Sequence, residues 1–95
     1  MAKSVAHVPT ESGSRYLQQL CKHWGHKYPV SFDPMHGEIN LPMGPVRMDA
    51  TPSELVVALE TEDAAALDRF EGVVAEHVSR FAHRETLQFN WNRQD

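Results

Sequence analysis

The chain contains a single cysteine, Cys21, so no disulfide can form within it. No apolar run approaches the about 20 residues that a membrane-spanning helix needs, and residues 1–10 lack the apolar centre of a signal peptide. The nine lysines and arginines nowhere form a block, and the net charge is -4. These absences argue against a membrane protein, a secreted disulfide scaffold and a nucleic-acid-binding protein. We therefore expect a cytoplasmic protein with no nucleic-acid partner.

The length of the chain fits one domain. Its 95 residues, 41% of them hydrophobic and 23% charged, are ordinary values for a water-soluble fold. No repeat, low-complexity segment or linker divides the sequence. We expect residues 1–95 to form a single α+β domain whose ends, residues 1–9 and 92–95, are flexible. Within the first of these ends, residues 5–8 have the pattern of an edge strand.

Two stretches have the apolar spacing of amphipathic helices. The first is predicted to begin at an N-cap, Thr10 or Ser12, and to end near residues 25–27. At about 100° per residue, its apolar face consists of Tyr16, Leu17, Leu20, Cys21 and Trp24. The second is predicted over about residues 62–82, with Thr61 as its N-cap. Acidic residues in its first turn and basic residues in its last turn agree with the helix dipole.

Between the two helices the apolar period changes to two, which is typical of β-strands. Four short strands are predicted, over about residues 28–32, 39–41, 46–50 and 55–59. The turn-forming segments between them favour antiparallel hairpins. A last half-buried strand is predicted over residues 87–91. The predicted architecture is α+β, with two helices on one face of a mainly antiparallel sheet of four to five strands. The predicted order of elements is α-β-β-β-β-α. The alternative has additional edge strands at both ends.

The histidines make metal coordination the first chemistry to consider, since six of them occur in a small chain. Cys21 and His23 are two residues apart, about 200° around a helix, so they cannot bind one ion together. His23 and His26 are three apart and share a helix face, and His77 could supply a third ligand through a tertiary contact. No CxxC or HExxH motif accompanies them. The alternative is that each is a structural histidine with its hydrogen bonds satisfied.

His77 is predicted to face the core or the interface between the helices, because it lies on the apolar side of the second helix. Arg80 and Arg84 run along the edge of the same side, so with His77 they could receive a carboxylate or a phosphate. Ion pairs with Glu76 or Glu85 are the alternative use of both arginines.

Catalysis has no signature in the chain. Cys21 is predicted to be a half-buried, inert thiol with no base in contact along its own helix. The sequence has no glycine-rich phosphate loop, no GxSxG motif and no pair of carboxylates in a predicted cleft. Aromatic side chains near the histidines are predicted to wall a small pocket instead. They are Tyr16, Trp24 and Phe81.

Two segments of the chain carry a resemblance to a known family. They are QLCKHW at residues 19–24 and RFAxRE at residues 80–85, accompanied by a Gly-centred hairpin at residues 42–44 and a closing Trp91. His83 and Gly25 depart from the family pattern. The pattern, which spans about residues 8–91, resembles the bacterial family called domain of unknown function 2218. The resemblance implies no established activity. Some members are associated with, or joined to, siderophore-interacting flavin reductases, which implies a role in iron handling and such a reductase, or another protein, as a partner.

The sequence supports two main hypotheses of function. In the first, the domain is an accessory module that binds a small ligand or a transition metal connected with iron metabolism, between the end of the first helix and the second helix. His23, His26 and His77 are its candidate metal or ligand contacts, and Arg80 and Arg84 its candidate anion contacts. In the second, it is a protein-interaction module with no bound ligand and no catalytic activity.

A third hypothesis, an enzyme that uses Cys21 or a histidine, requires a solvent-reachable and reactive thiol. The sequence names no cofactor, and it is compatible with either a monomer or a homodimer.

Overall fold

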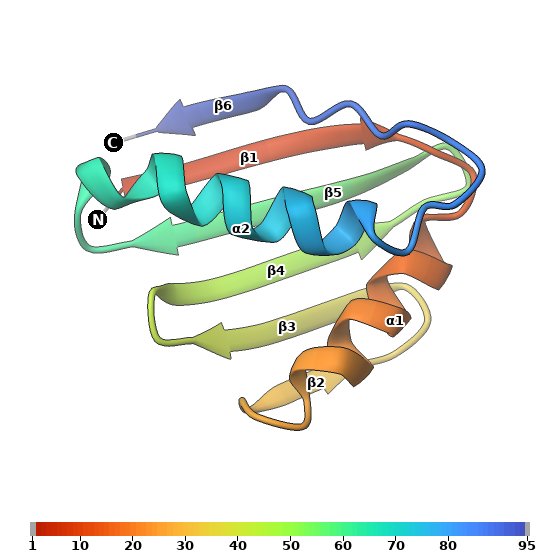
Figure 1. Ribbon diagram of the computed structural model, residues 1–95, viewed down its shortest axis with the longest axis horizontal. Coiled ribbons are helices and arrows are strands. Elements are labelled where there is room, and N and C mark those ends of the chain that lie inside the picture. Colours follow the sequence, from red (N-terminus) through yellow and green to blue (C-terminus); the bar gives the residue numbers. More distant parts are fainter. Residues whose placement is uncertain (1, 95) are drawn as a thin grey trace.

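The computed structural model describes residues 2–94 and contains one antiparallel sheet of six strands with two helices across one face (Figure 1). The strands are β1 (Ala2–Pro9), β2 (Val30–Phe32), β3 (His36–Leu41), β4 (Gly44–Ala50), β5 (Glu54–Thr61) and β6 (Trp91–Gln94). The helices are α1 (Gly13–Trp24) and α2 (Leu67–Ser79), and a short 3-10 turn, Ala64–Ala66, precedes α2. The predicted α+β architecture is confirmed, although the sheet has six strands rather than four or five.

The two ends of the domain are paired strands, which corrects the prediction of flexible ends at residues 1–9 and 92–95. The strand order is β2-β3-β4-β5-β1-β6, so β1 lies inside the sheet and not at its edge. Ala2 pairs with Thr61 on β5, and Lys3 pairs with Gln94 on β6. The last strand begins only at Trp91, later than predicted. Residues 1 and 95 lie outside the described residues.

The predicted meander in the middle of the chain is confirmed by the antiparallel pairing of β2, β3, β4 and β5. Gly44 begins β4 with a φ of +143°, and a Cβ atom there would lie 1.9 Å from the Glu60 carbonyl oxygen. Only glycine fits that position. Gly37 on β3 passes directly beneath α1, since a Cβ atom there would lie 2.9 Å from Cys21 Sγ.

Helix α1 buries the face that its spacing predicts, which consists of Tyr16, Leu17, Leu20, Cys21 and Trp24. Ser12 occupies the N-cap position but makes no side-chain capping bond. Thr10 instead accepts a hydrogen bond from the Ser12 backbone N–H at 3.0 Å, which fixes the approach to the helix.

Helix α2 is shorter than predicted at both ends. At its start, Ala66 and not Thr61 is at the N-cap position of α2, and it makes no side-chain capping bond. Asp63 caps the preceding 3-10 turn, accepting a hydrogen bond from the Ala65 N–H at 2.9 Å. At its end, the N–H groups of Phe81 and Ala82 bond to carbonyls three residues back, which tightens and ends the last turn. The basic residues from Arg80 onward therefore leave the helix.

The core lies between the sheet and the two helices. Its largest fully buried side chains are Phe70, Leu17, Leu20, Ile39, Met48, Leu55, Leu59 and Leu67. Within the described residues, no helix is both long and apolar enough to cross a membrane.

Candidate functional site

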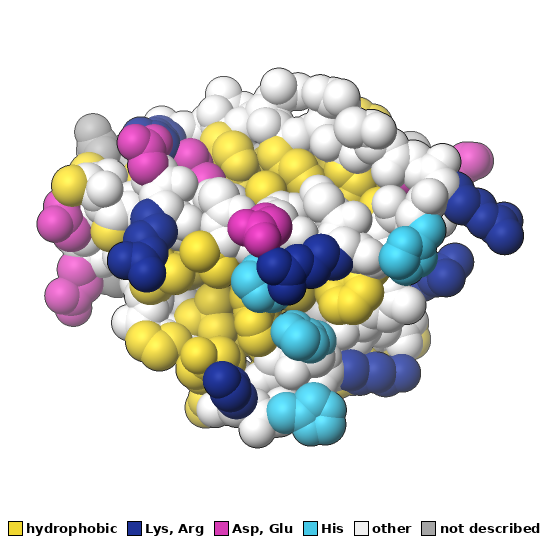
Figure 2. All heavy atoms as spheres, viewed as in Figure 1, with side chains coloured by type: hydrophobic (Ala, Val, Ile, Leu, Met, Phe, Trp, Pro, Cys, Tyr) yellow, Lys and Arg dark blue, Asp and Glu magenta, His cyan; other side chains and the backbone are white. Residues whose placement is uncertain are grey.

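A cavity of about 570 Å³ opens where the end of α1 and the second half of α2 face the β3–β4 turn. It is lined by His23, Trp24, His26, Lys27, Tyr28, Leu41, Pro42, Met43, Val73 and His77. Figure 2 shows an apolar surface on this side of the molecule, with histidine side chains grouped beside it. The three histidines singled out in the sequence thus share one site.

The rings of the site pack against one another across the two helices. The Trp24 and His77 ring centroids are 4.9 Å apart at an interplanar angle of 39°, and those of His23 and His77 are 5.9 Å apart. Phe81 packs edge-on against His23 at 6.2 Å but does not line the cavity. The aromatic contacts therefore hold the His77 ring against the end of α1.

His77 is further held by its own helix. Its Nδ1 lies 2.7 Å from the carbonyl oxygen of Val73, one turn earlier in α2. This bond agrees with the alternative that His77 is a structural histidine, because it satisfies one of the two ring nitrogens. The side chain is half-buried, as expected for a residue on the inner edge of the helix.

The three histidines line one cavity, but they are not placed as a three-residue ligand group. Among residues 2–94, no three His, Cys, Asp or Glu side chains are grouped closely enough to hold a metal ion. His26 lies beyond the end of α1 at Trp24, so the helical spacing that places it on the same face as His23 does not apply. The shared cavity brings the imidazoles together as lining groups and not as a ligand set.

A family model described as "Uncharacterized protein conserved in bacteria (DUF2218)" matches residues 5–92. The chain belongs to this family. The NMR structure of PA4090 from Pseudomonas aeruginosa is 38% identical in sequence to this DUF2218 domain. The similarity covers 97% of this chain and 96% of that chain, with a TM-score of 0.80. No curated protein matches the domain.

The two arginines of the predicted anion site lie outside the cavity of the DUF2218 domain. Arg80 forms an ion pair with Glu76, with Nη2 and Oε1 2.7 Å apart, and both side chains are exposed. Arg84 is also exposed, beyond the end of α2. Because the helix ends at Ser79, the predicted stripe from His77 through Arg80 to Arg84 is interrupted.

Tyr16, one of the predicted pocket walls, lies elsewhere. It is two turns before Trp24 on α1, about 12 Å along the helix axis. Its hydroxyl donates a 2.5 Å hydrogen bond to Oε2 of Glu85, and Thr10 donates to the same oxygen at 2.9 Å. Burial raises the pKa of the Tyr16 phenol, and the Glu85 carboxylate raises it further. Tyr16 thus ties the segment after α2 to α1.

The environment of Cys21 does not meet the requirement of the enzyme hypothesis. The residue is fully buried, and burial raises the pKa of its thiol to about 11. A thiolate is the form that reacts, so this thiol is inert near neutral pH.

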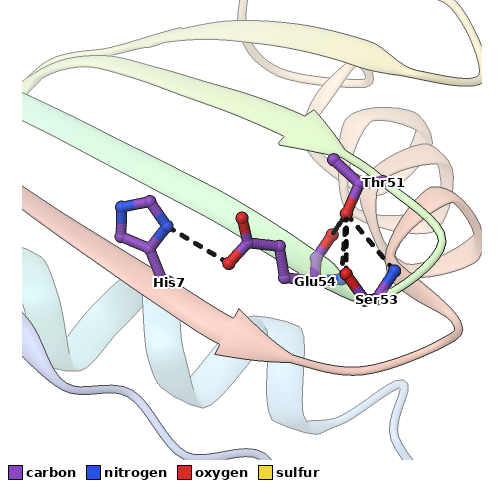
Figure 3. A network of polar contacts seen from close by, with 4 residues as sticks. All are labelled: His7, Thr51, Ser53 and Glu54. Atoms are coloured by element: carbon purple, nitrogen blue, oxygen red, sulfur yellow. Dashed lines mark hydrogen bonds and ion pairs between the residues drawn. The ribbon is translucent and has the colours of Figure 1, made fainter.

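A second group of polar contacts lies away from the cavity, between β1 and the β4–β5 turn (Figure 3). Thr51 Oγ1 accepts hydrogen bonds from the backbone N–H groups of Ser53 at 3.3 Å and Glu54 at 3.1 Å. The Glu54 carboxylate faces His7 on β1, 3.2 Å from its Nδ1. These contacts are exposed and set the geometry of a turn, so they present no enclosed site.

Six residues that line the cavity were not predicted from the sequence to belong to the site. They are Lys27, Tyr28, Leu41, Pro42, Met43 and Val73. One signal in the sequence could have indicated part of this set, because Pro42 and Met43 place apolar surface in a turn where polar residues are usual. The remainder come to the site only through the pairing of β2 and β3 and the packing of the helices.

Proposed function

We propose that this domain binds a small molecule with a planar apolar body and an anionic group, in the cavity between α1, α2 and the β3–β4 turn. The volume of about 570 Å³ lies within the range of about 300–1,000 Å³ typical of small-molecule pockets. The buried Trp24 and the half-buried Tyr28, Met43 and Val73 supply a surface suited to a flat apolar ligand.

The observation that carries the proposal is the charge of the lining. The chain has 13 acidic and 9 basic residues, so it is acidic overall. The described residues that line the cavity nevertheless include one lysine and three histidines and no carboxylate. Lys27, His23 and His26 are exposed, which supports a basic rim around an apolar interior. Such a rim favours a ligand anion over a cation.

An NMR titration of ¹⁵N-labelled protein with 2-naphthoate tests the proposal. We expect saturable shifts at the Trp24 indole N–H and at the amides of Val73 and His77. Lys27→Gln should weaken binding several-fold. Lys22→Gln is the matched control, because Lys22 is exposed on α1 but does not line the cavity. The absence of saturable shifts, or an equal loss in both variants, would refute the proposed site.

The connection of this ligand with iron or siderophores depends on the resemblance alone and stays a prediction, as do a flavin reductase partner and a cytoplasmic location. The lining does not favour a metal as the ligand, since it lacks a three-residue ligand set within residues 2–94.

A protein-interaction module is the second candidate function. The observation in its favour is that two large apolar side chains, Phe32 at 40% and Met35 at 43%, are exposed at the outer strand β2 and the turn after it. Such side chains next to an unpaired strand edge are suited to contact another chain. Sedimentation over a concentration series tests the simplest case, self-association. In that case Phe32→Ser would abolish a concentration-dependent increase in mass without changing the fold.

A further inference from the structure

The bond between His77 and Val73 determines which ring nitrogen of His77 carries the proton. A carbonyl oxygen can only accept, so Nδ1, 2.7 Å from the Val73 oxygen, must be the donor. In the neutral imidazole the other nitrogen, Nε2, then has a free lone pair. His77 is therefore fixed in the tautomer that accepts a hydrogen bond at Nε2.

This acceptor has no partner of its own within residues 2–94. No hydrogen bond within those residues involves Nε2. The atom is also not fully buried, so another molecule can reach it. His77 lines the cavity and is half-buried. Nε2 is thus the nitrogen of this lining side chain that remains able to accept a hydrogen bond.

The His77 ring is also restrained in position. Its Nδ1 is bonded to the helix backbone, the Trp24 ring lies 4.9 Å from it at 39°, and the His23 ring lies 5.9 Å from it at 42°. Among the other polar lining groups, Lys27 can only donate, and no hydrogen bond within residues 2–94 fixes the tautomer of His23 or His26 as the Val73 carbonyl fixes that of His77. An acceptor held in this way loses little freedom when it forms a hydrogen bond to a ligand.

We propose that His77 determines specificity in the cavity, by accepting at Nε2 a hydrogen bond from a hydroxyl group on a bound aromatic ligand. The ligand class is then a hydroxyaryl compound, which is favoured over the corresponding aryl ether of the same shape. This inference depends on the proposed function, because it names a chemical group of the ligand that the same cavity would take. The selectivity arises because an ether covers Nε2 without supplying a donor.

The test compares 2-naphthol with 2-methoxynaphthalene, two probes that differ in one hydroxyl donor. Titrations are followed by NMR at about pH 8, above the ordinary imidazole pKa of about 6.5. We expect wild-type protein to bind the naphthol at least about tenfold more tightly than the ether. His77→Phe keeps a ring against Trp24 and should bring the ratio close to one. His83→Phe, at an exposed histidine outside the cavity, should leave the ratio unchanged.

The ¹⁵N resonances of the His77 ring in the free protein give a second readout, which needs neither a ligand nor a variant. A proton on Nδ1 supports the inference, and a proton on Nε2 overturns it. Equal affinity of wild-type protein for the two probes also overturns it, and if 2-naphthoate still binds, the proposed function stands. If neither these probes nor 2-naphthoate binds, the proposed function fails and this inference fails with it.

Discussion

Arg93 on β6 donates two hydrogen bonds to the carboxylate of Glu71 on α2, from Nε to Oε2 at 3.1 Å and from Nη2 to Oε1 at 2.9 Å. Ser4 on β1 donates a third to Oε2 at 2.5 Å. Burial raises the pKa of Glu71, but the hydrogen bonds from Arg93 and Ser4 and the Arg93 charge outweigh it, so the net pKa is lowered. One nearly buried carboxylate therefore joins α2 to strands from the two ends of the domain.

Replacing Glu71 by glutamine should reduce the free energy of unfolding at pH 7 by about 2 kcal/mol, because it removes charged hydrogen bonds from a buried site. Since the pKa of Glu71 is lowered by folding, its stabilisation is present above the ordinary value of 4.5 and is lost as the pH falls through the folded value. Glu71→Gln should remove this part of the acid dependence. Urea unfolding at pH 7 and through the acid range measures both effects.

The control is Arg80→Ala, because the pair of Arg80 with Glu76 is exposed on both sides. Exposed pairs contribute little, so we expect a change within about 0.5 kcal/mol. Equal losses in the two variants would show that the Glu71 cluster is no more stabilising than a surface ion pair.

Tyr16→Phe should lower the free energy of unfolding by about 1 kcal/mol, since it removes the hydrogen bond to Glu85 and leaves the ring in place. The Tyr16 phenol also determines how the free energy of unfolding changes at alkaline pH. Because the pKa of Tyr16 is raised above 10.0, the stabilisation is complete below that value and is lost as the pH rises through the folded value. Phenolate absorbance of native protein measures this titration. A Tyr16→Phe variant as stable as wild type would contradict the assignment.

Gly37→Ala should destabilise the domain by about 1–3 kcal/mol, because the added methyl group meets Cys21 Sγ at 2.9 Å and Leu17 Cδ2 at 3.1 Å. Cys21→Ala removes the sulfur and should relieve part of that clash. The double variant should therefore lose less stability than the sum of the two single variants. A double-mutant cycle by urea unfolding measures the coupling, and strict additivity would argue against close contact between β3 and α1.

The Cys21 thiol should resist alkylation in the native protein. Its pKa of about 11, caused by burial, leaves almost no thiolate near neutral pH, and the side chain is inaccessible. We expect iodoacetamide to label denatured protein rapidly and native protein only as fast as it unfolds. Mass spectrometry measures both rates. Rapid labelling of native protein would restore the enzyme hypothesis that burial now disfavours.

The elements that the sequence predicts well are those with a strong local period. The spacing from Tyr16 to Trp24 identifies the buried face of α1, and the alternating residues from 28 to 59 identify the meander. Strand β1 is harder to recognise, because three of its inward side chains, Ala2, Ser4 and Ala6, are too small to give an apolar signal. The end of α2 is misjudged because Phe81 continues the helical spacing after the helix itself has ended.

The candidate site likewise has some residues that the sequence predicts and others that it does not. His23 and Trp24 can be located from the sequence because they lie at the end of one amphipathic helix, and His77 because it lies on the inner side of the other. Met43 enters the cavity through a hairpin whose position depends on strand pairing between distant residues. No pattern in the local sequence predicts such pairing. The loss of His26 from any metal set likewise depends on where α1 ends.

The position of β1 between β5 and β6 has a consequence for biosynthesis. Among the strands of this sheet β1 is made before the others, its partner β5 spans residues 54–61, and its second partner β6 begins only at residue 91. Completion of this sheet must therefore await the synthesis of β6, which favours slow, late assembly. During that interval the small side chains of Ala2, Ser4 and Ala6 give the nascent segment little apolar surface with which to pair with a neighbouring chain.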